Sequence, residues 1–321
     1  MLGVAIIGAG TMGFRHAHAF NRITGVEITE VYNRSRAKAE KLASEFRTCR
    51  VADSIDSLSL CRFEIVVVAV SVENVHVICE ELFEIPQMRE KIFLIEKPIG
   101  LDLATTKRMN RLVKLHKLNV FVGLNRRSYS STRILTRFLD RDPNANRFVL
   151  VEDQQDPDFE FSRGTCEQVC KSWMYANSIH MVDYVSIICR GLVTEVSRLS
   201  RYQGNFREKQ DISAHLKFDS GDEALYVCHW NRPGPWRISV SSGNRFFDLD
   251  PLESLRYRTQ GSRSWNPARI GNADFGKDRP GLVHQANCVV AFALNRSSES
   301  DSLAQLEDLQ KSVDLVERIY A

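Results

Sequence analysis

Three glycines that directly follow a short apolar run constrain this chain more than any other feature of its sequence. The run at residues 4–7 is followed by Gly8, Gly10 and Gly13, and an amphipathic segment continues to residue 22. This order predicts a β-strand, a tight turn and an α-helix. In such a turn the first glycine permits the sharp reversal, the second leaves the backbone open to a phosphate, and the third lets the helix pack on the strand. The alternative is a turn whose glycines serve the backbone geometry alone.

The same alternation of apolar runs and amphipathic segments continues to residue 124. The predicted elements are strands at residues 4–7, 26–32, 65–70, 91–96 and 119–124, and helices at residues 12–22, 35–45, 73–83 and 103–118. Strands that are nearly all Val and Ile, with helices between them, are typical of a parallel sheet covered on both faces. We therefore predict an α/β, doubly wound domain over residues 1–124.

The pattern changes over residues 125–321, where we predict a second domain. The predicted elements there are helices at 131–139, 177–189, 282–294 and 302–320, and apolar or alternating runs at 147–151, 193–202, 212–218, 224–230, 236–241 and 245–249. Alternation of period two indicates a mainly antiparallel sheet with one covered face. The acidic stretch 152–158 has no metal-ligand spacing, and we predict a solvated turn and no metal.

The composition excludes several classes of partner. The 321 residues carry 43 Lys and Arg against 40 Asp and Glu, with no long basic run, so neither nucleic acid nor an anionic membrane is expected to bind. The longest apolar run, residues 65–70, is far shorter than the ~20 residues that span a bilayer. Eight scattered cysteines are typical of free thiols, and Cys166 and Cys170 alone lie close together. With no basic and apolar leader at residue 1, the expected location is the cytoplasm.

The glycine turn predicts a site for the pyrophosphate of a dinucleotide. At the start of the predicted helix, where Thr11 and Met12 lie, free N–H groups and the helix dipole favour an anion. The end of the second strand decides which dinucleotide binds, because enzymes that use NAD usually carry Asp or Glu there for the ribose 2′-hydroxyl. This chain has instead Asn33, Arg34, Ser35 and Arg36. An amide, a hydroxyl and guanidinium groups favour the 2′-phosphate of NADP(H), whereas NAD(H) is expected if the arginines are merely solvated.

Five motifs in order resemble the Gfo/Idh/MocA family (glucose-fructose oxidoreductase, inositol dehydrogenase and rhizopine catabolism). They are GAGTMG at 8–13 with His16 behind it, AVSVENVH at 69–76, EKP at 96–98, GLNRRSY at 123–129 and SIHMVD at 178–183. Each motif is modest, but five in this order span nearly the whole chain. The resemblance implies a Rossmann domain over residues 1–124, followed by an α+β domain over residues 125–321 with an open, mainly antiparallel sheet. It also implies an NAD(P)-dependent enzyme that transfers a hydride to or from a carbinol or carbonyl carbon of a sugar, polyol or nucleotide sugar.

The resemblance also implies roles for individual residues. Lys97 is expected to be the general acid/base, with His180 as its partner near the reacting oxygen; an imidazole suits proton transfer near neutral pH. The residues expected on the cofactor side, besides the glycine turn, are Ser71, His76, Glu96, Lys97 and Asn125. The residues expected to contact the substrate are Arg126, Arg127, Tyr129, Trp173, Tyr175, Asn177 and His180. At least one of Arg126 and Arg127 is expected to hold the domain junction together and not to contact the substrate.

One position departs from the family pattern. Many members carry Asp four residues before the histidine, where this chain has Ala176. Alanine cannot exchange a proton, and the neighbouring Asn177 can only orient or polarise an oxygen. The chain is therefore expected to use Lys97 and His180 without a carboxylate, or to be a dinucleotide-binding regulator or scaffold with a decayed catalytic set. Asp183 is expected to be structural, and the open sheet favours a homodimer or homotetramer, as in the family.

Overall fold

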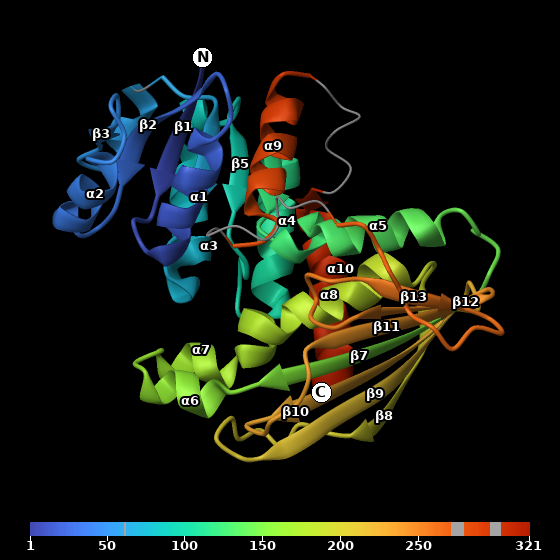
Figure 1. Ribbon diagram of the computed structural model, residues 1–321. Helices are drawn as coiled ribbons and strands as arrows, with labels where there is room; N and C mark the ends of the chain where they lie inside the picture. Colours follow the sequence, from blue (N-terminus) through green and yellow to red (C-terminus); the bar gives the residue numbers. More distant parts are fainter. Residues whose placement is uncertain (61, 271–278, 296–302) are drawn as a thin grey trace. The chain divides into compact units, whose positions relative to one another are not determined.

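The computed structural model describes all residues except 61, 271–278 and 296–302, and it forms two compact units (Figure 1). Unit 1 consists of Met1–Ser128 and Ala273–Gln310, and unit 2 of Tyr129–Asn272 and Lys311–Ala321. The chain therefore returns to its first unit late in the sequence. The sequence analysis predicted a second domain that runs unbroken from residue 125 to residue 321; the second unit of the structure does not.

Unit 1 is built on one seven-stranded sheet. Its strand order is β15-β6-β5-β4-β1-β2-β3, with bounds Ala304–Gln305, Asn119–Val122, Ile92–Ile95, Ile65–Val68, Leu2–Ile7, Val26–Tyr32 and Arg50–Val51. All neighbouring pairs are parallel except β15 with β6. Strands β4 and β5 are buried at every position, which explains their unbroken apolar sequence. The prediction of a doubly wound Rossmann domain is confirmed.

The helices of unit 1 are α1 (Thr11–Asn21), α2 (Arg36–Ala43), α3 (Val75–Glu84), α4 (Leu103–His116) and α9 (Leu282–Ala293). Helix α4 begins where the Asp102 carboxylate accepts a 2.6 Å hydrogen bond from the Thr105 amide, and it ends at Lys117, which has a left-handed backbone. Helix α9 lies beside α1 (Figure 1), and its buried residues belong to the same apolar core as β1 and β2. The sequence predicted this helix but not the sheet it covers, because an amphipathic pattern shows a buried face and not its partner.

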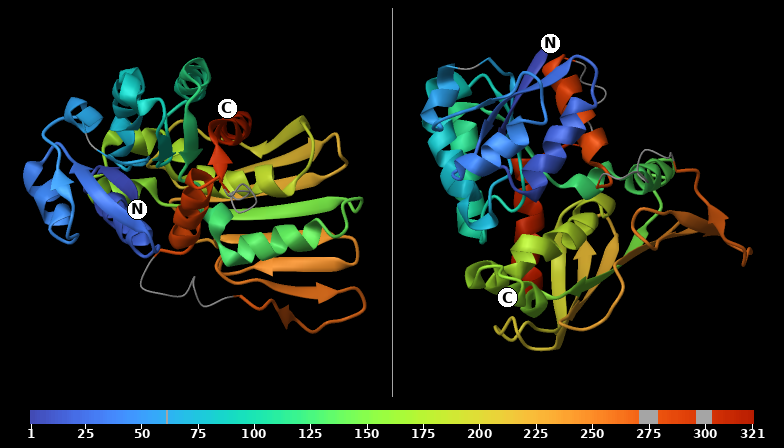
Figure 2. Two further views of the ribbon diagram at one scale, coloured as in Figure 1. Left: turned by 90° about the horizontal axis from the view of Figure 1, so that it is seen from above. Right: turned by 60° about the vertical axis from the view of Figure 1, so that its left-hand side comes forward.

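Unit 2 is built on an eight-stranded, mainly antiparallel sheet. Its order is β14-β13-β12-β11-β7-β10-β9-β8, with bounds Asn266–Pro267, Arg256–Thr259, Arg245–Leu249, Arg237–Ser242, Arg147–Gln155, Glu223–Trp230, Gln210–Phe218 and Val193–Ser200. Only β7 and β10, among these neighbours, run parallel. Helices α5 (Ser130–Leu139) and α8 (Ile179–Ile188) cover one face of this sheet, as the two views of Figure 2 show. The prediction of a mainly antiparallel second sheet is confirmed.

The prediction of a solvated turn over residues 152–158 is wrong, because a strand and the start of a helix occupy this stretch. Strand β7 continues through residues 152–155, and the side chains of Asp153 and Gln155 point into the core of unit 2, where they are almost fully buried. Two short helices, α6 (Pro157–Ser162) and α7 (Glu167–Lys171), then occupy a stretch for which no element was predicted. A polar residue on a strand is expected to face the solvent unless it belongs to a buried hydrogen-bond network. Unit 2 contains such a network.

The last helix, α10, spans Leu306–Tyr320 and follows the short strand β15. Its predicted start at residue 302 lies outside the described residues. Among the helices that the structure describes, none combines the length and the apolar character needed to cross a membrane. The cysteines described, Cys166 and Cys170 among them, are free thiols.

Candidate active site

The three glycines of the turn after β1 differ in how much space surrounds them. Gly8 has a φ of +105°, and a Cβ built on it would lie 2.4 Å from the carbonyl oxygen of Ala69. A Cβ on Gly13 would lie 1.7 Å from the carbonyl oxygen of Gly8, so helix and turn can pack only without a side chain there. A Cβ on Gly10 would meet no described protein atom within 4 Å. The fold therefore requires Gly8 and Gly13, whereas the space beside Gly10 is left for a ligand.

The N-terminus of α1 faces this space without a cap. Gly10 occupies the N-cap position, no side chain caps the helix, and its first turn contains no acidic residue. Thr11 is exposed and Met12 is partly exposed at this helix start. The first backbone N–H groups therefore lack an intrahelical partner and, with the helix dipole, favour an anionic group.

A pocket of about 360 Å³ opens at the same place. It brings together six residues predicted to bind the cofactor, namely Gly8, Gly10, Asn33, Arg34, Ser35 and Ser71. Asn33 holds the turn in place, because its side-chain oxygen accepts a 3.0 Å hydrogen bond from the Ala9 amide. Lys38, on the first turns of α2, also lines the pocket. The sequence analysis missed Lys38, although a basic residue in the helix that follows the second predicted strand could have been recognised as a candidate.

Arg36 and His76 do not line this pocket. The Arg36 guanidinium forms ion pairs with Asp53 at 2.5 Å and Glu40 at 2.9 Å, which hold it to the outer surface of α2. Arg34, in contrast, lines the pocket and makes no ion pair with a carboxylate in the described chain. Of the two arginines proposed for a 2′-phosphate, Arg34 is thus the one that the geometry favours.

Glu96 is held in the interior of unit 1 beside Lys97. Its carboxylate lies 2.6 Å from Nε2 of the buried His16. A Cβ built on Gly123 would lie 3.1 Å from the same carboxylate, so Gly123 leaves room for it. The pair fixes the strand end from which Lys97 projects, and it explains why His16 belongs to the motif.

Lys97 follows directly after β5, at the carboxyl edge of the parallel strands, where doubly wound sheets bind their ligands. Burial of the amine lowers the pKa of Lys97 to about 7; the Glu96 carboxylate opposes this shift, and the guanidinium groups of Arg126 and Arg279 add to it. An amine with this pKa can both accept and donate a proton near neutral pH. Arg279 was not predicted, because it lies far from the EKP motif in the sequence.

The residues after β6 are anchored within unit 1. The Asn125 amide donates a 3.1 Å hydrogen bond to the Pro280 carbonyl, and the Arg127 guanidinium lies 3.6 Å from the Asp308 carboxylate. Arg126 is buried, as is Tyr129 at the start of unit 2. Asn125 and Arg127 therefore hold the returning C-terminal segment, and a substrate role for any of these residues remains a prediction.

In unit 2 a π-helical turn, Met174–Ser178, leads into α8. Such turns often occur at functional sites, because the wider turn redirects side chains. His180 is buried in the first turn of α8, and Asn177 is half-buried immediately before it. Trp173 and Asn177 both donate to the side-chain oxygen of Gln155, at 2.7 Å and 2.8 Å.

The hydrogen bonds around Gln155 fix which way the Asn177 amide faces. Gln155 Nε2 donates a 2.6 Å bond to the buried Asp153 carboxylate, which leaves its Oε1 to accept. The indole N–H of Trp173 can only donate, so it supports the same orientation. Asn177 must then use its NH₂ group toward Gln155, and its carbonyl oxygen Oδ1, which has no partner within the described chain, is presented outward.

A second branch of the network starts from the other oxygen of Asp153. The Tyr226 hydroxyl donates to it at 2.8 Å and lies 2.8 Å from the Tyr320 hydroxyl, which donates to Ser178 Oγ at 3.1 Å. Both branches thus end on the turn before His180. Burial and the nearby Asp153 carboxylate raise the pKa of Tyr226 well above its usual value, so the phenol stays protonated as a donor.

Two further predicted residues have partners inside unit 2. Asp183 is buried and accepts a 2.7 Å hydrogen bond from Ser312 Oγ, in keeping with a structural role. The Tyr175 hydroxyl donates a 2.6 Å bond to Glu317 on α10. Within the described residues, no group of three or more His, Cys, Asp or Glu side chains is placed to hold a metal ion.

A Rossmann sheet with a glycine-lined, uncapped helix N-terminus, followed by a unit built on an open antiparallel sheet, defines a class of two-domain dinucleotide-binding proteins. Residues 2–124 match the model of the Gfo/Idh/MocA oxidoreductase family, described by its NAD-binding Rossmann fold. This match covers the N-terminal segment of unit 1 and agrees with the resemblance that the five motifs show. It is 29% identical over 125 residues to a myo-inositol dehydrogenase of Streptomyces leeuwenhoekii, a match that covers 38% of this chain and 36% of that protein.

Solved structures share the fold over nearly the whole chain. UDP-N-acetylglucosamine 3-dehydrogenase from Acidithiobacillus ferrooxidans has a TM-score of 0.77 at 16% identity, covering 99% of this chain and 96% of its own. A candidate NADPH-dependent oxidoreductase from Desulfitobacterium hafniense has a TM-score of 0.80 at 18% identity, covering 99% of this chain and 94% of its own. At these identities the likeness shows a shared fold and nothing further.

Proposed function

We propose that the protein is an NAD(P)-dependent dehydrogenase or reductase acting on a ring carbinol or carbonyl of a sugar, polyol or nucleotide sugar. The observation that carries the proposal is Lys97, whose amine follows strand β5 with a pKa lowered to about 7. A surface lysine stays protonated at this pH, whereas this one suits acid/base catalysis. The relatives named as myo-inositol and UDP-N-acetylglucosamine dehydrogenases support the substrate class.

The cofactor would be held by unit 1. The N–H groups at the start of α1 and the open side of Gly10 suit a pyrophosphate. Arg34, Ser35 and Lys38 supply two positive charges and a hydroxyl at the second strand end, so they favour the 2′-phosphate of NADP(H) over the plain ribose of NAD(H). The bound nicotinamide would supply the hydride acceptor or donor at its C4 carbon.

Proton transfer falls to the protein side chains. In the oxidation direction the neutral Lys97 amine accepts the hydroxyl proton of the carbinol, while the hydride leaves the carbon with both electrons of the C–H bond. In reduction the protonated amine returns that proton to the new alkoxide oxygen. We assign His180 as the second group that hydrogen-bonds the reacting oxygen, because an imidazole both donates and accepts.

Asn177 would take over the orienting part of the missing carboxylate at position 176. Its Oδ1 faces outward because Gln155 and Asp153 hold its NH₂ group, so it can accept a hydrogen bond from a substrate hydroxyl. It cannot exchange a proton, and this leaves acid/base work to Lys97 and His180. The uncovered face of the unit 2 sheet is the surface through which we expect a homodimer or homotetramer to form.

The alternative is a dinucleotide-binding regulator or scaffold, favoured by Ala176 alone. Two measurements distinguish an enzyme from a regulator. Calorimetric titration with NADP⁺ and NAD⁺ measures cofactor binding, and the absorbance of reduced nicotinamide with myo-inositol, aldoses and UDP-N-acetylglucosamine measures turnover. The proposed enzyme binds NADP⁺ more tightly and reduces it with at least one of these compounds. Dinucleotide binding without reduction across the whole panel would favour the regulator.

A further inference from the structure

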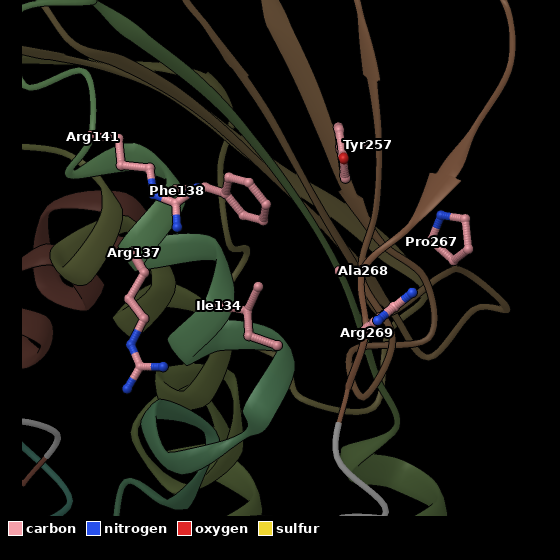
Figure 3. A pocket seen from close by; sticks show the side chains of 8 residues that line it. All are labelled: Ile134, Arg137, Phe138, Arg141, Tyr257, Pro267, Ala268 and Arg269. Atoms are coloured by element: carbon pink, nitrogen blue, oxygen red, sulfur yellow. The ribbon is translucent and has the colours of Figure 1, made fainter.

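A second cavity lies entirely within unit 2, between helix α5 and the last strands of the sheet. We call it the α5 groove; it has a volume of about 410 Å³. Figure 3 shows its two walls: Ile134, Arg137, Phe138 and Arg141 come from α5, and Tyr257 and Arg269 come from the strand side. It shares no residue with the cofactor pocket of unit 1.

Three arginines line the α5 groove without a balancing acid. Arg137, Arg141 and Arg269 are exposed, and none forms an ion pair with a carboxylate in the part of the chain that the structure describes. Some arginines elsewhere in unit 2 are paired; for example, Arg190 and Arg237 lie 2.6 Å from Asp222 and Asp248. Because none of the lining residues is acidic, the cavity has an unbalanced positive charge that an anionic ligand would neutralise.

The floor of the groove is aromatic. The Phe138 ring packs against Tyr257, with 5.4 Å between the centroids, and it extends from α5 toward the strands in Figure 3. The guanidinium groups of Arg141 and Arg245 lie 5.1 Å and 5.7 Å from the centroid of the same ring. Planar apolar faces beside guanidinium groups suit a ligand with a flat ring at one end and negative charge at the other.

We propose that the α5 groove binds a nucleoside phosphate, with the base against Phe138 and Tyr257 and the phosphates against the arginines that line the groove. The volume lies within the range of small-molecule pockets, about 300–1,000 Å³. Guanidinium groups on both walls suit the several oxygens of a phosphate chain better than a single carboxylate. The site is separate from hydride transfer, so it stands whether or not the proposed enzyme activity is correct.

The test is calorimetric titration with ADP, in which the number of sites is the readout. ADP also resembles part of a dinucleotide, so the wild-type protein is expected to take up one equivalent at the α5 groove and one at the glycine turn. The double variant Arg137→Glu/Arg141→Glu is expected to lose one equivalent, or to weaken that site more than about tenfold. Arg201→Glu, which makes the same kind of charge change at an exposed position of unit 2, is expected to keep both sites.

A second variant and a second probe keep the result interpretable. Arg269→Ala changes only the strand wall, so it is expected to weaken the same site even if the double variant were to fold poorly, and Tyr257→Leu is expected to weaken ADP binding by removing a ring face. An unchanged number of sites in all three variants would overturn the proposal. Tripolyphosphate binding the groove as tightly as ADP would overturn the nucleoside part and reduce the groove to a phosphate site.

Discussion

Lys97 is the residue whose surroundings most change its chemistry. Its amine is buried beside two guanidinium groups, and one carboxylate only partly offsets them. That carboxylate, Glu96, is itself held by His16, so the strand end has a fixed geometry.

The pH dependence of turnover should follow the Lys97 amine. In the oxidation direction kcat/KM is expected to rise with pH through about 7 and then level off, because the neutral amine is the base. Lys97→Met should lower kcat by about 10²–10⁴-fold and remove this rise, whereas the exposed Lys107→Met should do neither. A Lys97→Met variant with the wild-type profile would exclude Lys97 as the acid/base.

The same shift has a consequence for stability. The pKa of Lys97 is about 7 in the folded chain and about 10.5 as a free side chain, so between these values the unfolded state binds more protons. The free energy of unfolding contributed by this residue should therefore rise as the pH increases from 7 toward 10. Urea denaturation of wild type and Lys97→Met at several pH values measures it: the difference between the two proteins should grow in favour of wild type with pH. A constant difference would contradict the shifted pKa.

The Asn177 amide should matter through its oxygen. Asn177→Leu is expected to lower kcat/KM for the sugar substrate by about 10–100-fold, the cost of one lost hydrogen bond in a polar site, with no change in cofactor affinity. Trp173→Phe removes the other donor to Gln155 and leaves the Asn177 bond intact, so it should cost much less. Equal losses of kcat/KM in the two variants would contradict a specific role of the Asn177 amide and would show that both substitutions disturb the whole turn.

In the strand-turn-helix at the N-terminus, one glycine is needed for packing and another for the proposed binding of the cofactor. Gly13 packs where any Cβ would overlap the Gly8 carbonyl, and Gly10 faces open space. Strand β7 makes a similar division, since its inward residues Asp153 and Gln155 orient the turn before α8 instead of filling an apolar core. The proposed binding of the pyrophosphate rests on Gly10, and the proposed substrate contact rests on the turn that Asp153 and Gln155 orient.

The two glycines should therefore fail differently when substituted. Gly13→Ala is expected to destabilise the protein by roughly 3 kcal/mol, because the overlap forces helix and turn apart. Gly10→Ala should change the free energy of unfolding by less than about 0.5 kcal/mol, yet raise the dissociation constant for NADP⁺ by about tenfold or more. Denaturation and calorimetry distinguish them; a Gly10→Ala protein with unchanged affinity would contradict the placement of the pyrophosphate.

For the molecule as a whole, local patterns predicted most of the architecture. The strands of unit 1 and the hairpins of unit 2 follow from apolar runs and period-two alternation, and the glycine turn and Lys97 follow from short motifs. The patterns did not show that residues 273–310 complete unit 1, because pairing of β15 with β6 and packing of α9 on α1 are contacts between distant segments. They also missed Lys38 and Arg279, which approach the predicted residues only in the fold.

The buried network around Asp153 was hidden for a different reason. An acidic residue within an acidic stretch is expected at the surface, and only the hydrogen bonds from Gln155 and Tyr226 explain why this one is fully buried. Tyr226 lies 73 residues from Asp153 in the chain, so this contact leaves no local pattern. The orientation of Asn177, on which the proposed substrate contact depends, therefore became visible only in the structure.

The most direct test of the central claim is to follow the hydride itself. Reduced NADP carrying deuterium at both hydrogen positions of the nicotinamide C4 is incubated with the protein and with keto derivatives of inositol and of UDP-N-acetylglucosamine, and the products are analysed by mass spectrometry and NMR. The account predicts that deuterium appears on the ring carbon that bore the carbonyl, and that Lys97→Met greatly slows its appearance. Tight cofactor binding with all deuterium retained on the nicotinamide would contradict it.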